Sequence, residues 1–275
     1  MSLRRITTMA AAGCLALAVG CGDDDDGGGE ATSTTTEAPA PEPLTIVVTN
    51  DDGIGHRGID TLVTALEELE EAEVIVVAPA DDRTGASDRK TDGGAAYAEA
   101  ATVSGHEGTA VDGFPADTVT VALDELGLDP DLVVSGVNQG QNVGPLAYLS
   151  GTVGAAREAV RRGVPAIAGS AGIVDDADYA GAAELIVAYI EEHRDEYASG
   201  SASTDAVVSF NVPECSAGTA RELLEVPLAT VIPEGVNVFE SDCSVEPAEA
   251  PTDDVLAIAA GYSAVTPVPP EDPNA

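Results

Sequence analysis

The sequence predicts an α/β fold: a doubly wound, mostly parallel, Rossmann-like sheet with helices on both faces. Short runs of Val, Ile and Leu alternate along the chain with segments of helical periodicity, and these runs are apolar at every position. Strands that are apolar on both faces are typical of parallel sheets buried under helices. Aromatic residues make up 3% of the 275 residues and Trp is absent, so the core must be aliphatic.

The individual elements follow from local patterns. A helix over 58–72 is predicted by apolar residues at helical spacing, namely Ile59, Leu62, Val63, Leu66 and Leu69. Pro115 stands where a helix begins and predicts one over 115–126. Similar patterns predict helices at 151–162 and 179–197, and strands at 44–49, 74–78, 131–136, 165–168 and 206–212. From 213 to 254 the pattern weakens, and we expect short strands and loops at the edge of the main sheet.

The charge balance narrows the class of partner. Lys and Arg number 11 against 49 Asp and Glu, a formal net charge of -38. This argues against a nucleic-acid polymer as partner, and none is expected, because rows of phosphates could not be neutralised. A phosphate ester would also be repelled, so a phosphatase of this composition needs a local positive charge, which a bound divalent cation supplies.

The N-terminus has the features of an export signal. Arg4 and Arg5 precede an apolar stretch over 6–19 that is too short to span a bilayer, and Cys21 follows it as in a bacterial lipobox. We expect residues 1–21 to be a lipoprotein-type signal peptide with lipidation at Cys21, residues 22–43 to be a disordered acidic, Gly/Thr/Pro-rich linker, 44–269 the folded domain and 270–275 a tail. The protein would then be anchored on the outer side of the cytoplasmic membrane; ordinary cleavage near the same place would make it secreted instead.

Polar residues follow several of the predicted strands. Asp51 and Asp52 come directly after the first strand, Thr84 follows the second, and Asn138 and Asn142 follow the third. The carboxyl ends of parallel strands share one edge of the sheet, where ligands bind. Such oxygen-rich side chains suit Mg²⁺ or Mn²⁺. The next helix begins at 150–152, Ser-Gly-Thr, whose backbone N–H groups offer an anion site.

Each of these signals also has an ordinary structural interpretation. Asn-Asp-Asp-Gly is more often only a turn, and Ser150 is more often only a helix cap. His56, His106 and His193 have no evident partner in the sequence and are interpreted as surface or structural residues. Convergence on one edge of the sheet favours the functional interpretation, which is a metal beside an anion pocket and the hydrolysis of a phosphate ester.

Several motifs along the chain together resemble those of one known family. The motifs are Val-Thr-Asn-Asp-Asp-Gly-Ile at 48–54, Val-Ala-Pro-Ala-Asp-Asp-Arg-Thr-Gly-Ala-Ser at 77–87, Gly-Phe-Pro-Ala-Asp at 113–117, Asp-Leu-Val-Val-Ser-Gly-Val-Asn-Gln-Gly-Gln-Asn-Val-Gly at 131–144 and Ser-Gly-Thr-Val-Gly-Ala-Ala-Arg-Glu at 150–158. Phe-Asn-Val-Pro at 210–213 and Gly-Tyr-Ser-Ala-Val-Thr-Pro at 261–267 are similar to the family's late strands. The motifs occur in family order, and the family they resemble is that of the SurE (survival protein E) 5′/3′-nucleotidases. The resemblance implies a SurE-type sheet with a small C-terminal edge extension.

The resemblance also implies an activity and a site. It implies a divalent-metal-dependent phosphatase of nucleoside monophosphates, with one cation per site, Mg²⁺ or Mn²⁺, and the N-terminal signal makes this an exported member. The implied metal ligands are Asp51, Asp52, Thr84 and Asn138, and Asp51 and Asp52 are the catalytic residues. In an alternative form of the mechanism, Asp51 acts as a nucleophile. The implied phosphate-binding residues are Asn142, Ser150, Gly151 and Thr152.

This sequence departs from the family pattern at several positions. Thr84 replaces a Ser, Gln139 replaces a common Arg, and Pro145-Leu146 replaces an acidic pair. The loss of a cation at position 139 motivates an alternative, a non-catalytic nucleotide- or phosphate-binding lipoprotein on the same fold. The segment after Pro213 is shorter than in the family, so we expect a smaller assembly, such as a homodimer.

Four cysteines remain to be assigned. Cys14 lies in the predicted signal peptide and Cys21 is the expected lipid site, which leaves Cys215 and Cys243 in the domain. In an oxidising compartment these two most simply form a disulfide with each other, and two buried free thiols are the alternative. The bond requires Cα atoms within about 7 Å.

Overall fold

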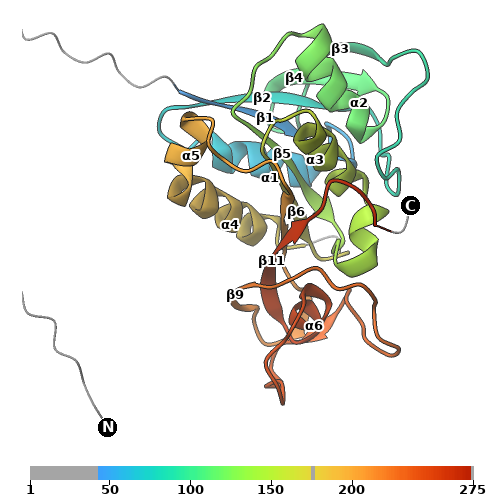
Figure 1. Ribbon diagram of the computed structural model, residues 1–275, viewed down its shortest axis with the longest axis vertical. Helices are drawn as coiled ribbons and strands as arrows, with labels where there is room; N and C mark the ends of the chain where they lie inside the picture. Colours follow the sequence, from blue (N-terminus) through green and yellow to red (C-terminus); the bar gives the residue numbers. More distant parts are fainter. Residues whose placement is uncertain (1–42, 175–176, 274–275) are drawn as a thin grey trace, which may run out of the picture. The chain divides into compact units, whose positions relative to one another are not determined.

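A mixed sheet forms the centre of the computed structural model, which describes residues 43–174 and 177–273 (Figure 1). The predicted signal peptide, Cys21 and almost all of the predicted linker lie outside the described residues. Within the described residues the main sheet has nine strands in the order β3-β4-β2-β1-β5-β6-β7-β11-β9. Their bounds are β1 Leu44–Thr49, β2 Ala72–Pro79, β3 Ala96–Ala101, β4 Glu107–Asp112, β5 Leu132–Gln139, β6 Ala166–Ala171, β7 Val207–Asn211, β9 Arg221–Glu225 and β11 Tyr262–Val268.

The strand order makes this a doubly wound sheet, as the sequence predicted. From β1 the chain first builds outward through β2 and β4, and then returns to the other side of β1 with β5, β6 and β7. All neighbouring strands from β4 to β7 are parallel, whereas β3 and β11 run antiparallel to β4 and β7. The direction of winding reverses between β1 and β5, and ligands bind at such a switch point, beyond the carboxyl ends of the strands.

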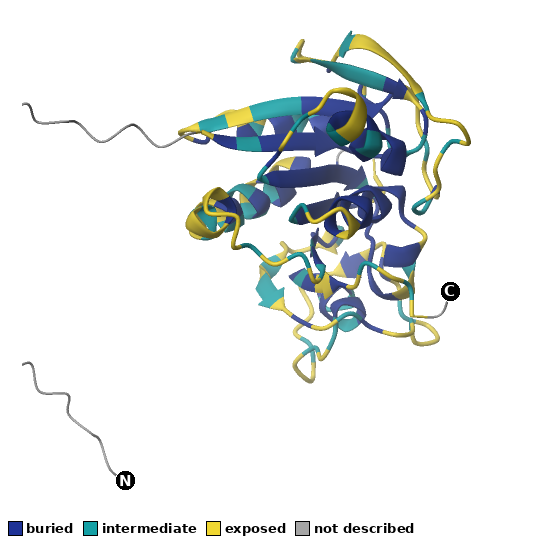
Figure 2. Ribbon diagram, turned by 45° about the horizontal axis from the view of Figure 1, so that its top comes forward, coloured by how far each residue is buried: buried dark blue, intermediate teal, exposed yellow. Residues whose placement is uncertain are grey.

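Helices cover both faces of the sheet and form two aliphatic cores. The side chains of Leu44, Ile46 and Val48 on β1 pack with α1 (Arg57–Leu66) and α4 (Tyr179–Glu192). Val47, on the opposite face of the same strand, packs with residues of α2 (Pro115–Thr120) and α3 (Gly151–Arg161). Figure 2 shows the central strands as buried almost throughout, which explains why they carry no polar alternation.

Two predicted helices end earlier than expected, whereas the helix predicted over 115–126 continues directly from α2 as a π-helix, Val121–Glu125. α1 ends at Leu66 rather than at 72. Continuing the helix would place the like charges of Glu67, Glu68, Glu70 and Glu71 at neighbouring helical positions. The helix predicted over 179–197 is two helices, α4 and α5 (Arg194–Ala198), separated at His193. The His193 ring donates a hydrogen bond to Tyr189 O (2.9 Å) and so takes a carbonyl of the last turn of α4.

The sequence did not predict strands β3 and β4. They form an antiparallel pair at one edge of the sheet, and the residues of β3 are mostly exposed. Their sequences, Ala-Tyr-Ala-Glu-Ala-Ala and Glu-Gly-Thr-Ala-Val-Asp, have few β-branched residues. Pairing with β2 and β4 rather than local propensity therefore decides their conformation.

The C-terminal segment forms the expected edge extension. β9 joins the main sheet beside β11, and β8 (Cys215–Ala217) pairs with β10 (Ser241–Asp242) in a separate small sheet. Helix α6 (Asp254–Ala259) packs in a third apolar cluster with β11 residues. Cys215 and Cys243 form a disulfide with Cα atoms 5.5 Å apart, which confirms the predicted pairing. No helix in the described part of the chain is both long and apolar enough to span a bilayer.

Candidate active site

The turn after β1 places two carboxylates at the switch point of the sheet. The buried Asn50 closes this turn: its side-chain amide donates to Gly53 O (2.9 Å), and Gly53 N donates to Asn50 Oδ1 (3.2 Å). Gly53 has a φ of +98°, which side-chain-bearing residues rarely adopt. The Asn-Asp-Asp-Gly motif is therefore a turn, as its ordinary interpretation says, and it holds Asp51 and Asp52 at the carboxyl end of β1.

The start of α3 packs directly against Asp51. Thr152 Oγ1 donates a hydrogen bond to Asp51 Oδ1. A Cβ on Gly151 would lie 2.8 Å from Asp51 Cβ and 2.9 Å from Asp51 Oδ2, so only glycine allows this approach. Thr152 and Gly151 thus fix the position of Asp51, while Ser150 caps α3 by accepting a hydrogen bond from Val153 N (3.1 Å).

Asp52 lies between two neighbouring segments. Its Oδ2 accepts a hydrogen bond from Gln139 N at the end of β5 (3.3 Å) and lies 3.4 Å from His56 Nδ1. His56 is also the N-cap of α1, because Nδ1 accepts from Gly58 N (3.2 Å). His56 therefore has a structural role, as the sequence indicated, but it also has a carboxylate partner that the sequence did not reveal.

Burial of negative charge dominates the electrostatics of this site. Burial, together with the charge of Asp52, raises the pKa of Asp51 to about 7. Burial, together with the charge of Asp82, raises the pKa of Asp52 to about 6. Burial lowers the pKa of His56, so its ring does not offset these charges. The site therefore has a deficit of positive charge that a cation would relieve.

The loop after β2 brings Thr84 to the same place. Arg83 N donates to Asp51 O (2.7 Å), which joins the loop to the turn after β1. Thr84 N and Oγ1 both donate to Asp82 Oδ1, at 2.7 and 2.6 Å. Ser87 anchors the far end of the loop. Its N donates to Leu149 O (3.1 Å), and its Oγ donates to Tyr148 O (2.6 Å).

Two asparagines complete the site from β5 and the segment after it. Asn138 Nδ2 donates to Gly140 O (2.6 Å), so its Oδ1 stays available as a ligand atom. Asn142 Nδ2 donates to Ser170 Oγ (2.9 Å), and Asn142 N donates to Asn211 Oδ1 (2.7 Å). The carboxyl ends of β5, β6 and β7 are thus linked at the site through Asn142.

A cavity of about 180 Å³ connects most of these residues. Of the residues selected from the sequence, Asp51, Thr84, Asn138, Asn142 and Ser150 line it. Asp52, Gly151 and Thr152 are not in its wall but contact residues that are. The cavity also has lining residues that the sequence did not suggest: Gln141, Leu146, Leu149, Ile173 and Phe239.

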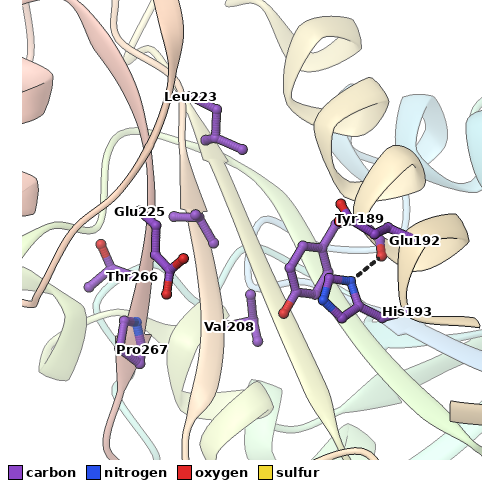
Figure 3. A pocket seen from close by; sticks show the side chains of 9 residues that line it. Tyr189, Glu192, His193, Val208, Leu223, Glu225, Thr266 and Pro267 are labelled. Atoms are coloured by element: carbon purple, nitrogen blue, oxygen red, sulfur yellow. Dashed lines mark hydrogen bonds between the residues drawn. The ribbon is translucent and has the colours of Figure 1, made fainter. Parts of the chain in front are cut away.

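A larger hollow lies elsewhere, between α4 and the outer strands of the sheet (Figure 3). It measures about 430 Å³, and its walls include Tyr189, His193, Glu192 and Glu225 over an aliphatic floor. It shares no residue with the cavity around Asp51. Val208 on its floor belongs to the first half of β7, so this hollow lies away from the carboxyl ends of the strands.

The donor atoms around Asp51 suit one kind of metal. Among the described residues there is no cluster of three or more His, Cys, Asp and Glu that could hold an ion. Two carboxylates with amide and hydroxyl oxygens fit Mg²⁺ or Mn²⁺, which bind through one or two carboxylates and retain several waters. The raised pKa values of both carboxylates agree with this fit.

Comparison with known proteins agrees with this geometry. Residues 46–230 match the family model "Survival protein SurE". The 5′-nucleotidase SurE of Brevibacillus brevis is 36% identical over 82% of this chain and 90% of its own, and that of Syntrophobacter fumaroxidans is 32% identical over 82% and 93%. The crystal structure of the SurE protein from Aquifex aeolicus, at 24% identity, superposes with a TM-score of 0.66 over 84% of this chain and 95% of its own, and shows the same fold. The chain belongs to the SurE family.

Proposed function

We propose that this protein is a divalent-metal-dependent phosphomonoesterase that acts on nucleoside monophosphates, a 5′/3′-nucleotidase. The observation that carries the proposal is the contact between Asp51 and the N-terminus of α3 at the switch point of the sheet. A metal ligand and an anion site then lie side by side, which is the arrangement that phosphate-ester hydrolysis requires. The relatives from Brevibacillus brevis and Syntrophobacter fumaroxidans, both named 5′-nucleotidase, support this substrate class.

The residues of the site divide into two groups by role. Asp51, Asp52, Thr84 and Asn138 would hold the cation, which when bound supplies Lewis-acid chemistry and an activated water. Ser150 and the backbone N–H groups at the start of α3 would bind the phosphate oxygens, because the first N–H groups of a helix have no intrahelical partner. Asn142 lies in the wall of the same cavity and would orient the phosphate.

Phosphate release from the purified full chain tests this function. With Mn²⁺ or Mg²⁺ and a panel of nucleoside monophosphates, we expect chelator-sensitive release of phosphate. Asp51→Asn should abolish it with little loss of folding, because the site carries excess negative charge without its cation. Asp129→Asn is the matched control, since this exposed residue precedes β5 at the opposite end of the strand. Near-normal turnover by Asp51→Asn would contradict the assignment.

A non-catalytic binding lipoprotein is the alternative function. It is favoured by Gln139, whose side chain donates to Val174 O (2.9 Å) where the family commonly has an Arg. The same panel separates the two: tight binding of a nucleoside monophosphate without turnover, at every metal tested, would support the binding protein.

We further propose that the protein is exported, either anchored by a lipid on Cys21 to the outer side of the cytoplasmic membrane or secreted. Cys21→Ser should release the protein from membranes or prevent its maturation, and unchanged membrane association would point to an uncleaved anchor. The short segment after Pro213 supports a homodimer, which light scattering of the purified protein measures directly.

A further inference from the structure

The hollow between α4 and the outer strands forms because α4 does not reach the edge of the sheet. α4 packs over β5, β6 and β7. On the next two strands, Val265 of β11 and Leu223 of β9 are half-buried and line the hollow. Both pack against the same apolar core as α4. The aliphatic face of the sheet therefore continues past the helix as the floor of the hollow.

Strand pairing sets the order of the residues on this floor. Val208 on β7 lies opposite Pro267 on β11, and Val265 lies opposite Glu225 at the end of β9. Paired residues point to the same face of a sheet, so Glu225 lies at the outer side of the aliphatic floor. β11 lies between β7 and β9, and the floor is therefore two strand spacings, about 10 Å, across.

The opposite wall of the hollow is aromatic and also carries a carboxylate. The rings of Tyr189 and His193 on α4 stack with their centroids 4.0 Å apart. Glu192, between them in sequence, lines the hollow as well. Figure 3 shows Glu225 and the α4 side chains on opposite sides of Val208. The hollow thus has an acidic group on each side and an apolar middle.

The electrostatic potential in the hollow favours a cation. Among the described residues that line it, none is Lys or Arg. Burial raises the pKa of the Tyr189 hydroxyl. The charges of Glu196, Glu225 and Glu192 raise it further, so all three carboxylates act on the same point. An ammonium group would be attracted there and would also interact with the face of the Tyr189 ring.

The size of the hollow suits a small molecule. Its volume of about 430 Å³ lies within the range of about 300–1,000 Å³ that is usual for small-molecule sites. A ligand that matches the walls must be cationic at both ends and apolar in the middle. A linear aliphatic diamine has this pattern, because a chain of methylene groups joins its two ammonium groups.

We propose that this hollow binds a long-chain aliphatic diamine. The methylene chain lies on Val208 and Val265, one ammonium group pairs with Glu225, and the other pairs with Glu192 beside the Tyr189 ring. The site shares no residue with the cavity around Asp51, and the proposal does not depend on the proposed phosphatase function.

Two probes of equal chain length, 1,8-diaminooctane and spermidine, test the apolar floor. They differ at one position, where spermidine has a third charged nitrogen in place of a methylene group. General attraction to a chain of net charge -38 favours the more highly charged spermidine. The aliphatic floor favours 1,8-diaminooctane, because a buried charge without a partner is costly. In equilibrium dialysis of the full-length protein with Mg²⁺, we expect one bound diamine per chain and tighter binding of 1,8-diaminooctane.

Neutral variants at the two sides of the hollow test the carboxylates. Glu225→Gln and Glu192→Gln should each weaken the binding of 1,8-diaminooctane by about two- to fivefold, the usual contribution of an exposed ion pair. Glu222→Gln and Glu191→Gln are the matched controls, since these exposed carboxylates lie on the same strand and the same helix but outside the hollow. Asp51→Asn should leave the binding unchanged, which separates the hollow from the cavity.

Three results would overturn the proposal. Tighter binding of spermidine, or several equal weak sites per chain, would mean general attraction to the acidic surface. Equal losses in Glu225→Gln and Glu222→Gln would remove Glu225 from the site. No measurable binding of 1,8-diaminooctane at about 0.15 M salt, where attraction between distant charges is screened, would exclude the site itself.

Discussion

Gly154 on α3 controls the position of the loop that carries Thr84. A Cβ at this position would lie 2.1 Å from Ser87 O and 2.5 Å from Ser87 C. Folded proteins do not contain Cβ contacts shorter than 3.0 Å, and the atoms in the way are backbone rather than a flexible side chain. Gly154→Ala therefore forces the backbone at Ser87 to move by about 1 Å relative to α3.

The expected loss follows from the distance between the two positions. Ser87 lies three residues after Thr84, on the same loop, so a shift of the backbone there moves the proposed metal ligand. A displacement of about 1 Å in a catalytic group corresponds to about a 100-fold loss of rate, and we expect a 10- to 100-fold loss because the loop absorbs part of the shift. Alanine itself favours a helix interior over glycine by about 1 kcal/mol, which offsets part of the strain in the free energy of unfolding.

The two readouts therefore separate in this variant. We expect kcat/KM to fall steeply, while the midpoint of urea unfolding changes little. Gly55→Ala is the matched control, because this glycine has an ordinary φ and a Cβ added there would have no atom within 4 Å. If Gly154→Ala keeps kcat/KM within twofold of the unaltered protein, the contact between α3 and Ser87 does not position the loop.

The remaining predictions concern a ligand, a charge and a cross-link. Thr84→Ser should be nearly silent, whereas Thr84→Val should weaken the affinity for Mn²⁺, measured by titrating activity with metal; equal affinities would remove Thr84 from the ligand set. Burial raises the pKa of Asp60, but hydrogen bonds from Ser104 and Thr102 outweigh it and lower the pKa below its usual value. The charged form of Asp60 therefore stabilises the fold above the unfolded-state pKa, and this stabilisation is lost as pH falls through the folded-state pKa. Asp60→Asn should lower the free energy of unfolding by about 1 kcal/mol at pH 7 and by much less near pH 3, as measured by urea titrations at both pH values. Reducing the Cys215–Cys243 disulfide should lower the free energy of unfolding by about 3 kcal/mol, and a reductant should have no such effect on the Cys215→Ser/Cys243→Ser double variant.

The sequence predicted those parts of the molecule that depend on local pattern. Strands β1, β2, β5, β6 and β7 contain the apolar runs that the sequence showed, and their polar ends fall at one edge because these parallel strands share a direction. Asp51, Thr84, Asn138 and Ser150 could thus be grouped from the sequence alone, and the structure places all four around one cavity. Strand ends are a strong signal because the fold, rather than the side chain, decides where they meet.

Other features depend on contacts between distant segments, and no local pattern records them. The sequence did not indicate that the fully buried Thr152 donates its hydroxyl to Asp51. Phe239 lies in a segment without periodicity, and only the packing of the C-terminal extension brings it to the cavity. β3 has a sequence that would suit a helix equally well, and pairing with β4 decides its conformation.

The strong acidity of the chain is compatible with an anionic substrate because the proposed anion site at the start of α3 consists of neutral groups. Arg83, the cation next to Thr84 in sequence, is directed toward the edge of the sheet, where it donates to Gly113 O (3.1 Å) and pairs with Asp112 (3.3 Å). Surface charges more than about 10 Å from the site are largely screened at 0.1 M salt, so most of the net charge of -38 has little effect on a bound phosphate. The nearby charges are Asp51, Asp52 and Asp82, and these are the ones that a divalent cation would offset. In the proposed mode of binding, with the cation bound, the N-terminus of α3 would supply the remaining attraction through backbone N–H groups, which no change of surface composition removes.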